Sequence, residues 1–510
     1  MNALPVGLEP VLDVEQLRAS DTWAIRERGI PGVELMARAG EGLARVVATA
    51  APGGDVVVVC GGGNNGGDGY VVARLLREAG RLVHVLTTSD PAKLSGDART
   101  MFERLPGDPA IPFADGSLAG AHVIVDAILG TGFSGTPRDD VAHAIKAINV
   151  AAHAGIPVVA CDVPSGVDAA TGAVEGEAVE AVATATFHAA MPGLWIHPGK
   201  ARAGDVTVVD IGIPADGNPA HPWAGLIGRG ILATYPRRGA ESTKFVSGHV
   251  LVAGGSRGLT GAPCLSSLAA MRAGAGYVTV CVPDALNDIF EIKLTEVMSV
   301  PLPDDGGAGH HVEAGAGGVL EKAGRGALVV GPGLGRTDGA FAFARRLARA
   351  AEVALVLDAD GLNAHAGERL ATLAARGAPT VLTPHAGELA RLLDVESGAV
   401  DAHRLDHARE AARRSGAIVV LKGDDTIVAE PEGRVGISRG GSPGLATAGT
   451  GDVLSGVLGA FLARGMEPFE AACAAVFAHA EAGRRAAAAL SGPDGVIASD
   501  VVDELAKTLE

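Results

Sequence analysis

Aromatic residues, cysteines and lysines are scarce in this chain, and each scarcity narrows its possible roles. Aromatic residues are 3% of the 510 residues, whereas there are 73 glycines. Small side chains must therefore do much of the packing, which suits close contacts between helices and a sheet. The five cysteines are dispersed and no two form a C-x-x-C pair, which predicts reduced thiols in the core of a cytoplasmic protein. No His or Cys spacing typical of a zinc site occurs. The cysteines are Cys60, Cys161, Cys264, Cys281 and Cys473.

Signals for export, membrane insertion and nucleic-acid binding are also missing. Residues 1–10 contain neither a basic segment nor an apolar segment of the signal-peptide type. The longest uncharged runs, such as residues 147–161, are too short and too broken to cross a membrane. The formal net charge is −17, which gives no electrostatic footprint for nucleic acid. We therefore expect no membrane partner and no nucleic-acid partner. Neither a Walker A sequence nor a G-x-S-x-G motif is present.

Two successive α/β patterns fill the chain, whose length exceeds that of one domain. Short apolar runs typical of buried parallel strands alternate with Gly-rich turns and helical segments. The loop-rich residues 214–222 predict a linker, so we predict a first domain over residues 1–224 and a second over residues 225–510. The predicted strands are residues 55–60, 81–88, 121–128 and 156–163 in the first domain, and 249–253, 277–282, 327–330, 353–358, 380–382, 417–421 and 426–429 in the second.

A polar, Gly-rich turn follows the first predicted strand. Residues 61–70 read G-G-G-N-N-G-G-D-G-Y, which lacks the G-x-G-x-x-G spacing of a dinucleotide site and adds two asparagines. Asp126 and Asp162 follow two further strands, and because parallel strands end at one edge of a sheet, we expect them to share a crevice with this turn. The alternative is that each Asp, at the end of its strand, caps the next helix. Oxygen atoms of Asn65, Asp126 and Ser165 are of the kind that binds a monovalent or hard cation.

A second Gly-rich loop, residues 440–456, runs into a helix predicted from residue 453 to 462. Gly449 and Gly451 bring bare backbone close to any ligand, and the first N–H groups of the helix form an anion site. Asp452 would repel a phosphate there, so we interpret it as a proton acceptor; the alternative is a helix N-cap. Lys422, one of only eight lysines, would contact phosphate or be a solvated strand end.

Together these motifs resemble those of a known family, the bifunctional NAD(P)H-hydrate repair enzymes. This family joins an NAD(P)HX epimerase domain to an ADP/ATP-dependent NAD(P)HX dehydratase domain. The resemblance implies a Rossmann-like three-layer domain followed by a ribokinase-like α/β domain. Its motifs in the first half are L-M-A-R-A-G, G-G-G-N-N-G-G-D-G, D-A-I-L-G-T-G-F-S-G and D-V-P-S-G-V-D. Those in the second half are G-G-S-R-G-L-T-G-A, R-A-G-A-G, G-P-G-L-G, D-A-D-G-L-N, T-P-H-A-G-E, K-G-D-D-T and A-T-A-G-T-G-D-V-L-S-G.

The resemblance assigns residues to two sites. In the epimerase, the hydrated dinucleotide NADHX or NADPHX would be bound by Asn64, Asn65, Gly66, Gly67, Asp68, Gly130, Thr131, Gly132, Phe133, Ser134, Gly135, Thr136 and Asp162. Asp162 would also move the proton, and Asn65, Asp126 and Ser165 would hold a potassium ion. In the dehydratase, the hydrate would be bound by Ala262, Gly333, Gly335, His385 and Asp452. The adenine nucleotide would be bound by Lys422, Gly423, Asp424, Asp425, Thr426, Gly449, Thr450 and Gly451.

In the implied dehydratase reaction, phosphate replaces hydroxide as the leaving group. Asp452, as general base, would take the proton of the C6 hydroxyl while that oxygen accepts a phosphoryl group from the nucleotide. Phosphate would then leave and NAD(P)H would be restored. The Arg- and Ala-rich composition favours the bacterial form of the reaction, with ADP rather than ATP as co-substrate, and magnesium is expected by analogy with phosphoryl transfer.

Three segments depart from the family pattern. Arg38 replaces an Asn, Thr243-Lys244-Phe245 replaces His-Lys-Gly, and Asp424 with Asp425 places two carboxylates in the nucleotide loop. We also expect a homo-oligomer. Two alternatives stay open at this stage. One is a kinase for a vitamin precursor or sugar, since G-T-G-D serves such enzymes too. The other is a first domain that binds nucleotide without catalysis.

Overall fold

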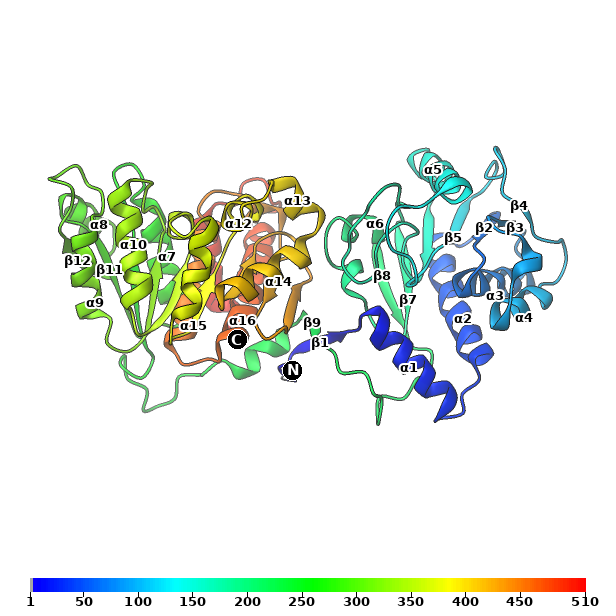
Figure 1. Ribbon diagram of the computed structural model, residues 1–510, viewed down its shortest axis with the longest axis horizontal. Helices are drawn as coiled ribbons and strands as arrows, with labels where there is room; N and C mark the ends of the chain where they lie inside the picture. Colours follow the sequence, from blue (N-terminus) through cyan, green and yellow to red (C-terminus); the bar gives the residue numbers. More distant parts are fainter. Residues whose placement is uncertain (1–2) are drawn as a thin grey trace. The chain divides into compact units, whose positions relative to one another are not determined.

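The computed structural model describes residues 3–510 and divides into two compact units. One unit is formed by residues 10–224, and the other joins the residues up to Glu9 to residues 225–510. The expected first domain began at residue 1, but the strand β1 (Leu8–Val11) belongs to the edge of the second unit's sheet, beside β9 (Ala224–Ile227). Backbone hydrogen bonding along that sheet edge explains the difference. Figure 1 shows both units coloured along the chain.

The first unit is built on a seven-stranded parallel sheet with strand order β4-β3-β2-β5-β6-β7-β8. The strands are β2 (Val56–Cys60), β3 (Val83–Thr87), β4 (Ile111–Pro112), β5 (Val123–Ala127), β6 (Val158–Cys161), β7 (Ala183–Phe187) and β8 (Asp205–Val209). The helices are α1 (Val14–Arg26), α2 (Gly32–Ala50), α3 (Asn64–Glu78), α4 (Gly96–Glu103), α5 (Asp139–His153) and α6 (Lys200–Ala203).

Helices cover both faces of this sheet, because its central strands are apolar on both sides. In β2, Val56 and Val58 pack into a core with α2 and α3, whereas Val57 and Val59 pack into a core with α5. Successive residues of a strand point to opposite faces. The first unit is therefore the predicted Rossmann-like three-layer domain.

Helix α3 begins earlier than the sequence predicted. We expected residues 61–70 to be a loop, yet Asn64 is the first residue of α3. Glycines inside a helix are costly, but here they allow contact with the sheet: a Cβ on Gly66 would lie 2.1 Å from the Gly61 carbonyl oxygen, and one on Gly69 would lie 2.7 Å from the Cys60 sulfur. Close packing thus holds the polar residues of this stretch on a rigid helix.

The second unit has an eleven-stranded sheet in the order β1-β9-β18-β17-β16-β15-β14-β13-β10-β11-β12. Strands from β16 to β12 run parallel, and β16, β17 and β18 pair antiparallel. The remaining strands are β10 (His249–Ala253), β11 (Tyr277–Pro283), β12 (Met298–Leu302), β13 (Ala327–Val330), β14 (Ala354–Leu357), β15 (Thr380–Leu382), β16 (Ile418–Leu421), β17 (Ile427–Ala429) and β18 (Val435–Ser438).

Helices also cover this sheet, with α15 at the centre of the larger core. Eleven of its residues are buried, and glycines let it approach its neighbours: a Cβ on Gly456 would lie 2.1 Å from the Ser266 carbonyl oxygen of α7, and one on Gly459 would lie 2.7 Å from Val329 of β13. The helices are α7 (Gly261–Arg272), α8 (Asn287–Lys293), α9 (Ala316–Lys322), α10 (Asp338–Ala350), α11 (Asp360–Asn363), α12 (Ala386–Leu393), α13 (Ser397–Ala402), α14 (Arg404–Ser415), α15 (Thr450–Ala463), α16 (Pro468–Ala489) and α17 (Ala498–Thr508).

The predicted α/β class is confirmed in both units, and every predicted strand is present within a few residues of its expected ends. Over residues 3–510, no helix is both long enough and apolar enough to span a membrane. All five cysteines are buried and free, as the dispersed pattern predicted.

Candidate functional site

A cavity of about 650 Å³ lies at the carboxyl edge of the first sheet. Its walls come from α1 and α2, from the start of α3, and from the loops after β2, β5 and β6. The predicted residues Asn64, Asn65, Asp68 and Asp162 line it, together with residues 130–133. The Gly-rich turn and Asp162 therefore do share one crevice, as expected, whereas Asp126 does not line it.

Asp126 and Ser165 are buried and hydrogen-bonded to each other, and Asn65 is linked to Ser165 through the Leu129 carbonyl oxygen, to which both donate. Asp126 accepts hydrogen bonds from the Ser165 hydroxyl (2.6 Å), the Ser165 N–H (2.8 Å) and the Ile128 N–H (3.2 Å). Asn65 donates to the Leu129 carbonyl oxygen at 2.8 Å, which leaves the Asn65 Oδ1 buried without a partner among the described residues. A buried amide oxygen without a donor is costly, and a cation beside it would remove that cost. The donor set fits a potassium ion better than a transition metal.

Asp162 lies at the end of β6 in a left-handed conformation, with φ of 67°. Its carboxylate accepts hydrogen bonds from the Thr131 N–H and the Thr186 hydroxyl, both at 3.3 Å. Burial raises its pKa to about 6, and the hydrogen bond from Thr131 opposes that rise. Such a carboxyl exchanges protons close to neutral pH, as an acid–base catalyst requires.

Two more carboxyls with raised pKa values share the cavity. Burial, followed by the charges of Asp162 and Asp21, raises the pKa of Asp68 well above its usual value. Burial raises the pKa of Asp21 on α1 to about 6. Asp21 had no sequence motif to mark it, since it lies inside an ordinary amphipathic helix. The site therefore concentrates carboxyls that retain protons.

Part of the predicted binding stretch does not line the cavity. Gly66 and Gly67 are buried inside α3, where a Cβ on Gly67 would meet the Met36 sulfur at 2.7 Å. Ser134, Gly135 and Thr136 lie beyond the lining, and the Thr136 hydroxyl donates to the Glu175 carbonyl oxygen at 2.7 Å. Arg38 donates to the Ile211 carbonyl oxygen at 3.0 Å, so its role in the described chain is to hold two segments of this domain together.

In the second unit, Asp452 lies in the first turn of α15. This helix begins directly after Gly449, whose backbone is left-handed (φ 91°). Burial raises the pKa of Asp452 to about 7; the charge of Asp358 adds to this rise, and that of Lys422 opposes it. Asp452 is not the N-cap of α15, because Gly449 occupies that position and no side chain caps the helix. A carboxyl at this place that titrates near neutral pH is suited to take a proton.

Lys422, directly after β16, pairs with carboxylates that follow β14 and β15 in the chain. Its ammonium donates to Asp358 at 3.0 Å and lies 3.7 Å from the Glu388 carboxylate. Burial lowers the pKa of Lys422, but the two carboxylates outweigh it and raise the pKa above its usual value. A Cβ on Gly451 would lie 3.3 Å from the Lys422 ammonium, so this ammonium lies at the head of α15. Asp358 also accepts a hydrogen bond from Ser455 of α15.

The loop after Lys422 is fixed by a buried ion pair. Arg404, at the start of α14, donates to Asp425 at 2.8 Å and to the Lys422 carbonyl oxygen at 3.2 Å. The two side chains are 6% and 2% exposed. Asp425 is thus paired with Arg404 and does not line the neighbouring cavity, whereas Asp424 lines it. Of the two carboxylates that the sequence places in the nucleotide loop, the structure puts Asp424 at the cavity.

This cavity has a volume of about 430 Å³ and lies between the 422–426 loop, the Gly-rich loop and α16. Thr450 lines it, but its hydroxyl is used within the loop, donating to the Leu445 carbonyl oxygen at 2.7 Å. His479 of α16 also lines it, and its Nε2 is buried without a partner in the part of the chain that the structure describes. The lining residues are Lys422, Gly423, Asp424, Thr426, Ser438, Gly441, Ser442, Pro443, Leu445, Ala446, Thr450, Gly451, Leu454, Val476, His479 and Ala480.

Of the predicted hydrate-binding residues, Gly333 and Gly335 follow β13, His385 follows β15, Ala262 lies in the first turn of α7, and Asp452 lies in α15. A Cβ on Gly333 would lie 3.3 Å from the Ala262 Cβ, and one on Gly335 would lie 3.1 Å from the Ser256 hydroxyl. His385 caps α12, accepting from the Gly387 N–H at 3.0 Å, and its side chain is 56% exposed. The structure thus brings Gly333 and Ala262 together. The charges of Lys422 and Asp358 affect the pKa of His385.

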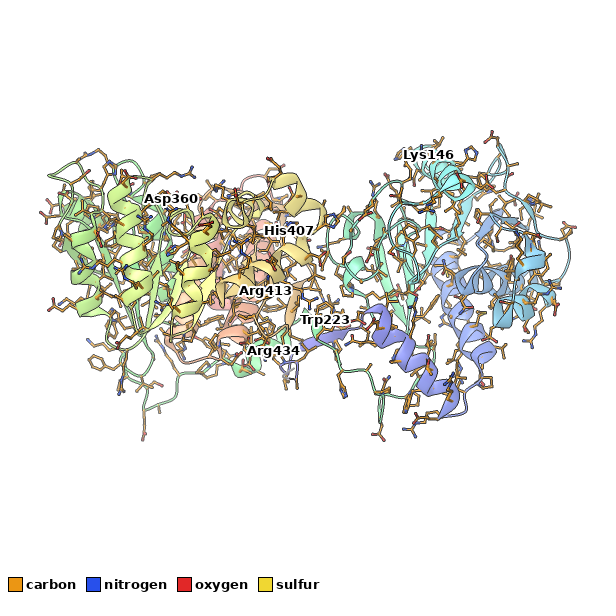
Figure 2. The ribbon with its side chains drawn as sticks, viewed as in Figure 1. Lys146, Trp223, Asp360, His407, Arg413 and Arg434 are labelled. Atoms are coloured by element: carbon orange, nitrogen blue, oxygen red, sulfur yellow. The ribbon has the colours of Figure 1, made fainter. Side chains whose placement is uncertain are left out.

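Four further polar residues of the second unit have clear positions. His249 is buried in β10, stacks on Tyr277 and pairs with the Thr279 hydroxyl at 2.9 Å, so it is a core residue. Lys244 lies over the Phe245 ring at 5.3 Å. Asp360, marked in Figure 2 at the start of α11, accepts from Arg336 at 2.9 Å. Arg404 was missed because no motif surrounds it.

Comparison with family sequence models divides the chain as its fold does. A model described as NAD(P)H-hydrate dehydratase matches residues 250–507, and one described as YjeF-related protein N-terminus matches residues 32–193. The structure of the ADP/ATP-dependent NAD(P)H-hydrate dehydratase from Bacillus subtilis, co-crystallised with ATP/Mg²⁺, is 27% identical, covers 55% of this chain and 94% of its own, and has a TM-score of 0.46.

Full-length relatives extend this similarity over both domains. A bifunctional NAD(P)H-hydrate repair enzyme from Salinibacter ruber is 38% identical over 97% of this chain and 95% of its own length. One from Moorella thermoacetica is 38% identical over 86% of this chain and 84% of its own. The motifs, the two sites and these relatives agree: the chain belongs to the family of bifunctional NAD(P)H-hydrate repair enzymes, with an epimerase domain followed by a dehydratase domain.

Proposed function

We propose that the protein repairs hydrated NADH and NADPH in two steps. The first domain interconverts the R and S epimers of NAD(P)HX, and the second dehydrates the S epimer with consumption of ADP, releasing AMP and phosphate. The observation that carries the proposal is the head of α15, where Asp452, with a pKa of about 7, lies beside Lys422 at the carboxyl edge of the sheet. The full-length relatives are named bifunctional NAD(P)H-hydrate repair enzymes, which supports the proposal.

The residues of the second site suit phosphoryl transfer to a hydroxyl. Asp452 accepts the proton of the C6 hydroxyl while the hydroxyl oxygen bonds to the terminal phosphorus of the nucleotide. The backbone N–H groups of residues 449–451 and the Lys422 ammonium stabilise the negative charge on the transferring group. The electron pair of the ring nitrogen then expels phosphate from C6, and loss of a proton from C5 forms the double bond of NAD(P)H.

The nucleotide and its metal fit the charges of this site. The 430 Å³ cavity beside Lys422 is of the size of a small-molecule site, and we propose that it takes the adenine nucleotide. Asp358, Glu388 and Asp452 outnumber Lys422, and magnesium is commonly held by one or two carboxylates and the substrate phosphates. No cluster of three or more His, Cys, Asp or Glu residues that would hold a metal occurs within residues 3–510. Asp358 and Glu388 are the carboxylates that would hold a nucleotide-borne magnesium ion, which would offset phosphate charge.

In the first domain, Asn65, Asp126 and Ser165 would hold potassium, whose charge would satisfy the buried Asn65 Oδ1. The ion would fix the start of α3 against the loop after β5 through Asn65 and its hydrogen bond to Leu129. Asp162 and residues 130–133 would then contact the hydrated nicotinamide. The five buried thiols support a cytoplasmic setting, and the homo-oligomer stays a prediction for light scattering to test.

The decisive test uses purified protein, a mixture of R- and S-NADHX, magnesium, potassium and either ADP or ATP. The absorbance of NADH at equilibrium reports conversion. Complete conversion requires both domains, and conversion of the S fraction alone would refute the epimerase half of the proposal. Faster conversion with ATP than with ADP would overturn the choice of co-substrate. No NADH with either nucleotide would refute the dehydratase half.

A further inference from the structure

Asp68 is a buried carboxyl that the fold leaves without a partner. It lies on the second turn of α3, is 8% exposed, and lines the 650 Å³ cavity. Asp126 accepts three hydrogen bonds and Asp162 accepts two, whereas Asp68 accepts none from the side chains or backbone of residues 3–510. An unpaired buried carboxyl costs stability, so its presence at the cavity wall points to a partner that is the ligand.

The chemistry of the proposed substrate requires two proton-transferring groups, and this step rests on the proposed epimerase function. C6 of the hydrate bears a hydroxyl and is bonded to the ring nitrogen. When the nitrogen lone pair forms a C=N bond, the C6–O bond breaks and the oxygen leaves as water after taking a proton from an acid. A second water then adds to the opposite face of C6 and gives a proton to a base. One water leaves and one enters, so no other reagent is consumed.

We propose that Asp68 and Asp162 are the acid and base of this exchange, with Asp68 protonating the departing C6 hydroxyl and Asp162 deprotonating the incoming water. After one inversion Asp162 holds the proton and Asp68 is ionised. That state is ready to convert the product epimer back, as a reversible epimerase needs. Asp68 is thus a second catalytic residue rather than only a contact to the dinucleotide.

The surroundings of the two carboxyls support this division of roles. Asp162 is stabilised as an anion by the Thr131 N–H and the Thr186 hydroxyl, whereas Asp68 has no donor to stabilise its charge. Burial raises the pKa of both carboxyls: that of Asp162 to about 6, where the hydrogen bonds from Thr131 and Thr186 oppose the rise, and that of Asp68 well above its usual value, where no hydrogen bond opposes it. Pairs of this kind commonly act as base and acid at neutral pH.

Other charged groups face the same cavity and belong to the pH behaviour. Arg18 and Asp21 come from α1, Asp97 from α4, and His188 from the end of β7. Asp21 raises the pKa of both catalytic carboxyls. Burial lowers the pKa of His188, which favours its neutral form.

The test measures epimerisation in the full-length protein carrying Asp68→Asn. With excess ADP, magnesium and a mixture of R- and S-NADHX, NADH forms in a fast phase from the S epimer and a slow phase from the R epimer. The matched control is Glu78→Gln, an acid-to-amide change on the same helix with a side chain that is 53% exposed. General acid catalysis is worth about 10²–10⁴-fold, so we expect Asp68→Asn to slow the second phase at least 100-fold while the fast phase and the Glu78→Gln variant match wild type.

Three results decide between outcomes. A slow phase of Asp68→Asn within threefold of wild type, with an unchanged pH profile, overturns the role of Asp68 alone. The Asp162→Asn variant measures how fast R-NADHX is converted without the first domain's contribution. If the slow phase of the wild type is no faster than that of Asp162→Asn, the proposed epimerase function is overturned as well. If Asp68→Asn lowers the thermal transition of the first domain, the wild-type pH profile decides: we expect the slow-phase rate to fall on both the acid and the alkaline side, and a profile with one limb overturns the pair.

Discussion

Removing Arg404 should separate its structural role from its role in holding the nucleotide loop. The Arg404–Asp425 pair is buried, at 6% and 2% exposure, with a 2.8 Å hydrogen bond between the side chains. Breaking such a pair by removing one partner costs about 3–5 kcal/mol, because the other charge stays buried. Arg404→Met should therefore lower the thermal transition of the second domain by roughly 6–10 °C, at about 2 °C per kcal/mol for a large domain.

The double variant Arg404→Met/Asp425→Leu should recover most of this stability, since an apolar pair often replaces a buried ion pair at little cost. It should not recover nucleotide affinity, because the Lys422 carbonyl oxygen still lacks the donor that Arg404 places 3.2 Å away. The KM for nucleotide would then stay raised about tenfold, which corresponds to one lost hydrogen bond of about 1.4 kcal/mol.

The assay is thermal unfolding of the full chain with and without nucleotide, which marks the transition of the second domain, followed by steady-state kinetics. The control is Arg413→Met on the same helix α14 (Figure 2). The Arg413 side chain is 70% exposed and pairs with Glu410. An exposed pair is worth about 0–1 kcal/mol. The reasoning is refuted if Arg404→Met is no more destabilising than this control, or if the double variant restores both stability and KM.

Three further predictions concern Gly423, Asp452 and Asn65. Gly423→Ala should raise the nucleotide KM at least tenfold without changing the first domain's activity, because its Cβ would lie 2.4 Å from the Arg404 Nη2; an unchanged KM in steady-state kinetics would contradict this. The dehydration rate should rise with pH through about 7 as Asp452 ionises, and Asp452→Asn should lose that dependence with at least 100-fold of kcat, as a pH series of NADH formation will show. Potassium chloride should raise the Tm of the first domain above its value in equimolar sodium chloride, and Asn65→Leu should abolish the difference in calorimetry.

The sequence was sufficient to predict the order of elements and the edge of each sheet that bears the site. Buried parallel strands are continuous apolar runs, and Gly-rich turns at their ends are visible in a single sequence. Asp126, Asp162 and Lys422 were found in this way, because each stands where such a run ends. Glu388 and Asp358 lay within quoted motifs, although their contacts with Lys422 required the fold.

What the sequence did not reveal depends on contacts between distant residues. The glycines before Asp68 read as a loop, but close packing on β2 makes them helical and puts that carboxyl on the cavity wall. The sequence places Asp425 in the nucleotide loop, but it does not show that Arg404, 21 residues earlier, pairs with this carboxylate and neutralises it. Charge pairing and helix starts of this kind are set by tertiary structure and have no local pattern.

The most direct test of the central claim, that two domains act in series on one compound, starts from pure R-NADHX. The full-length protein with ADP, magnesium and potassium should convert all of it to NADH, with one AMP and one phosphate formed per NADH. Asp162→Asn should leave the R epimer almost unconverted while still dehydrating added S-NADHX at the wild-type rate. Equal rates of NADH formation from the R epimer by wild type and Asp162→Asn would contradict the account.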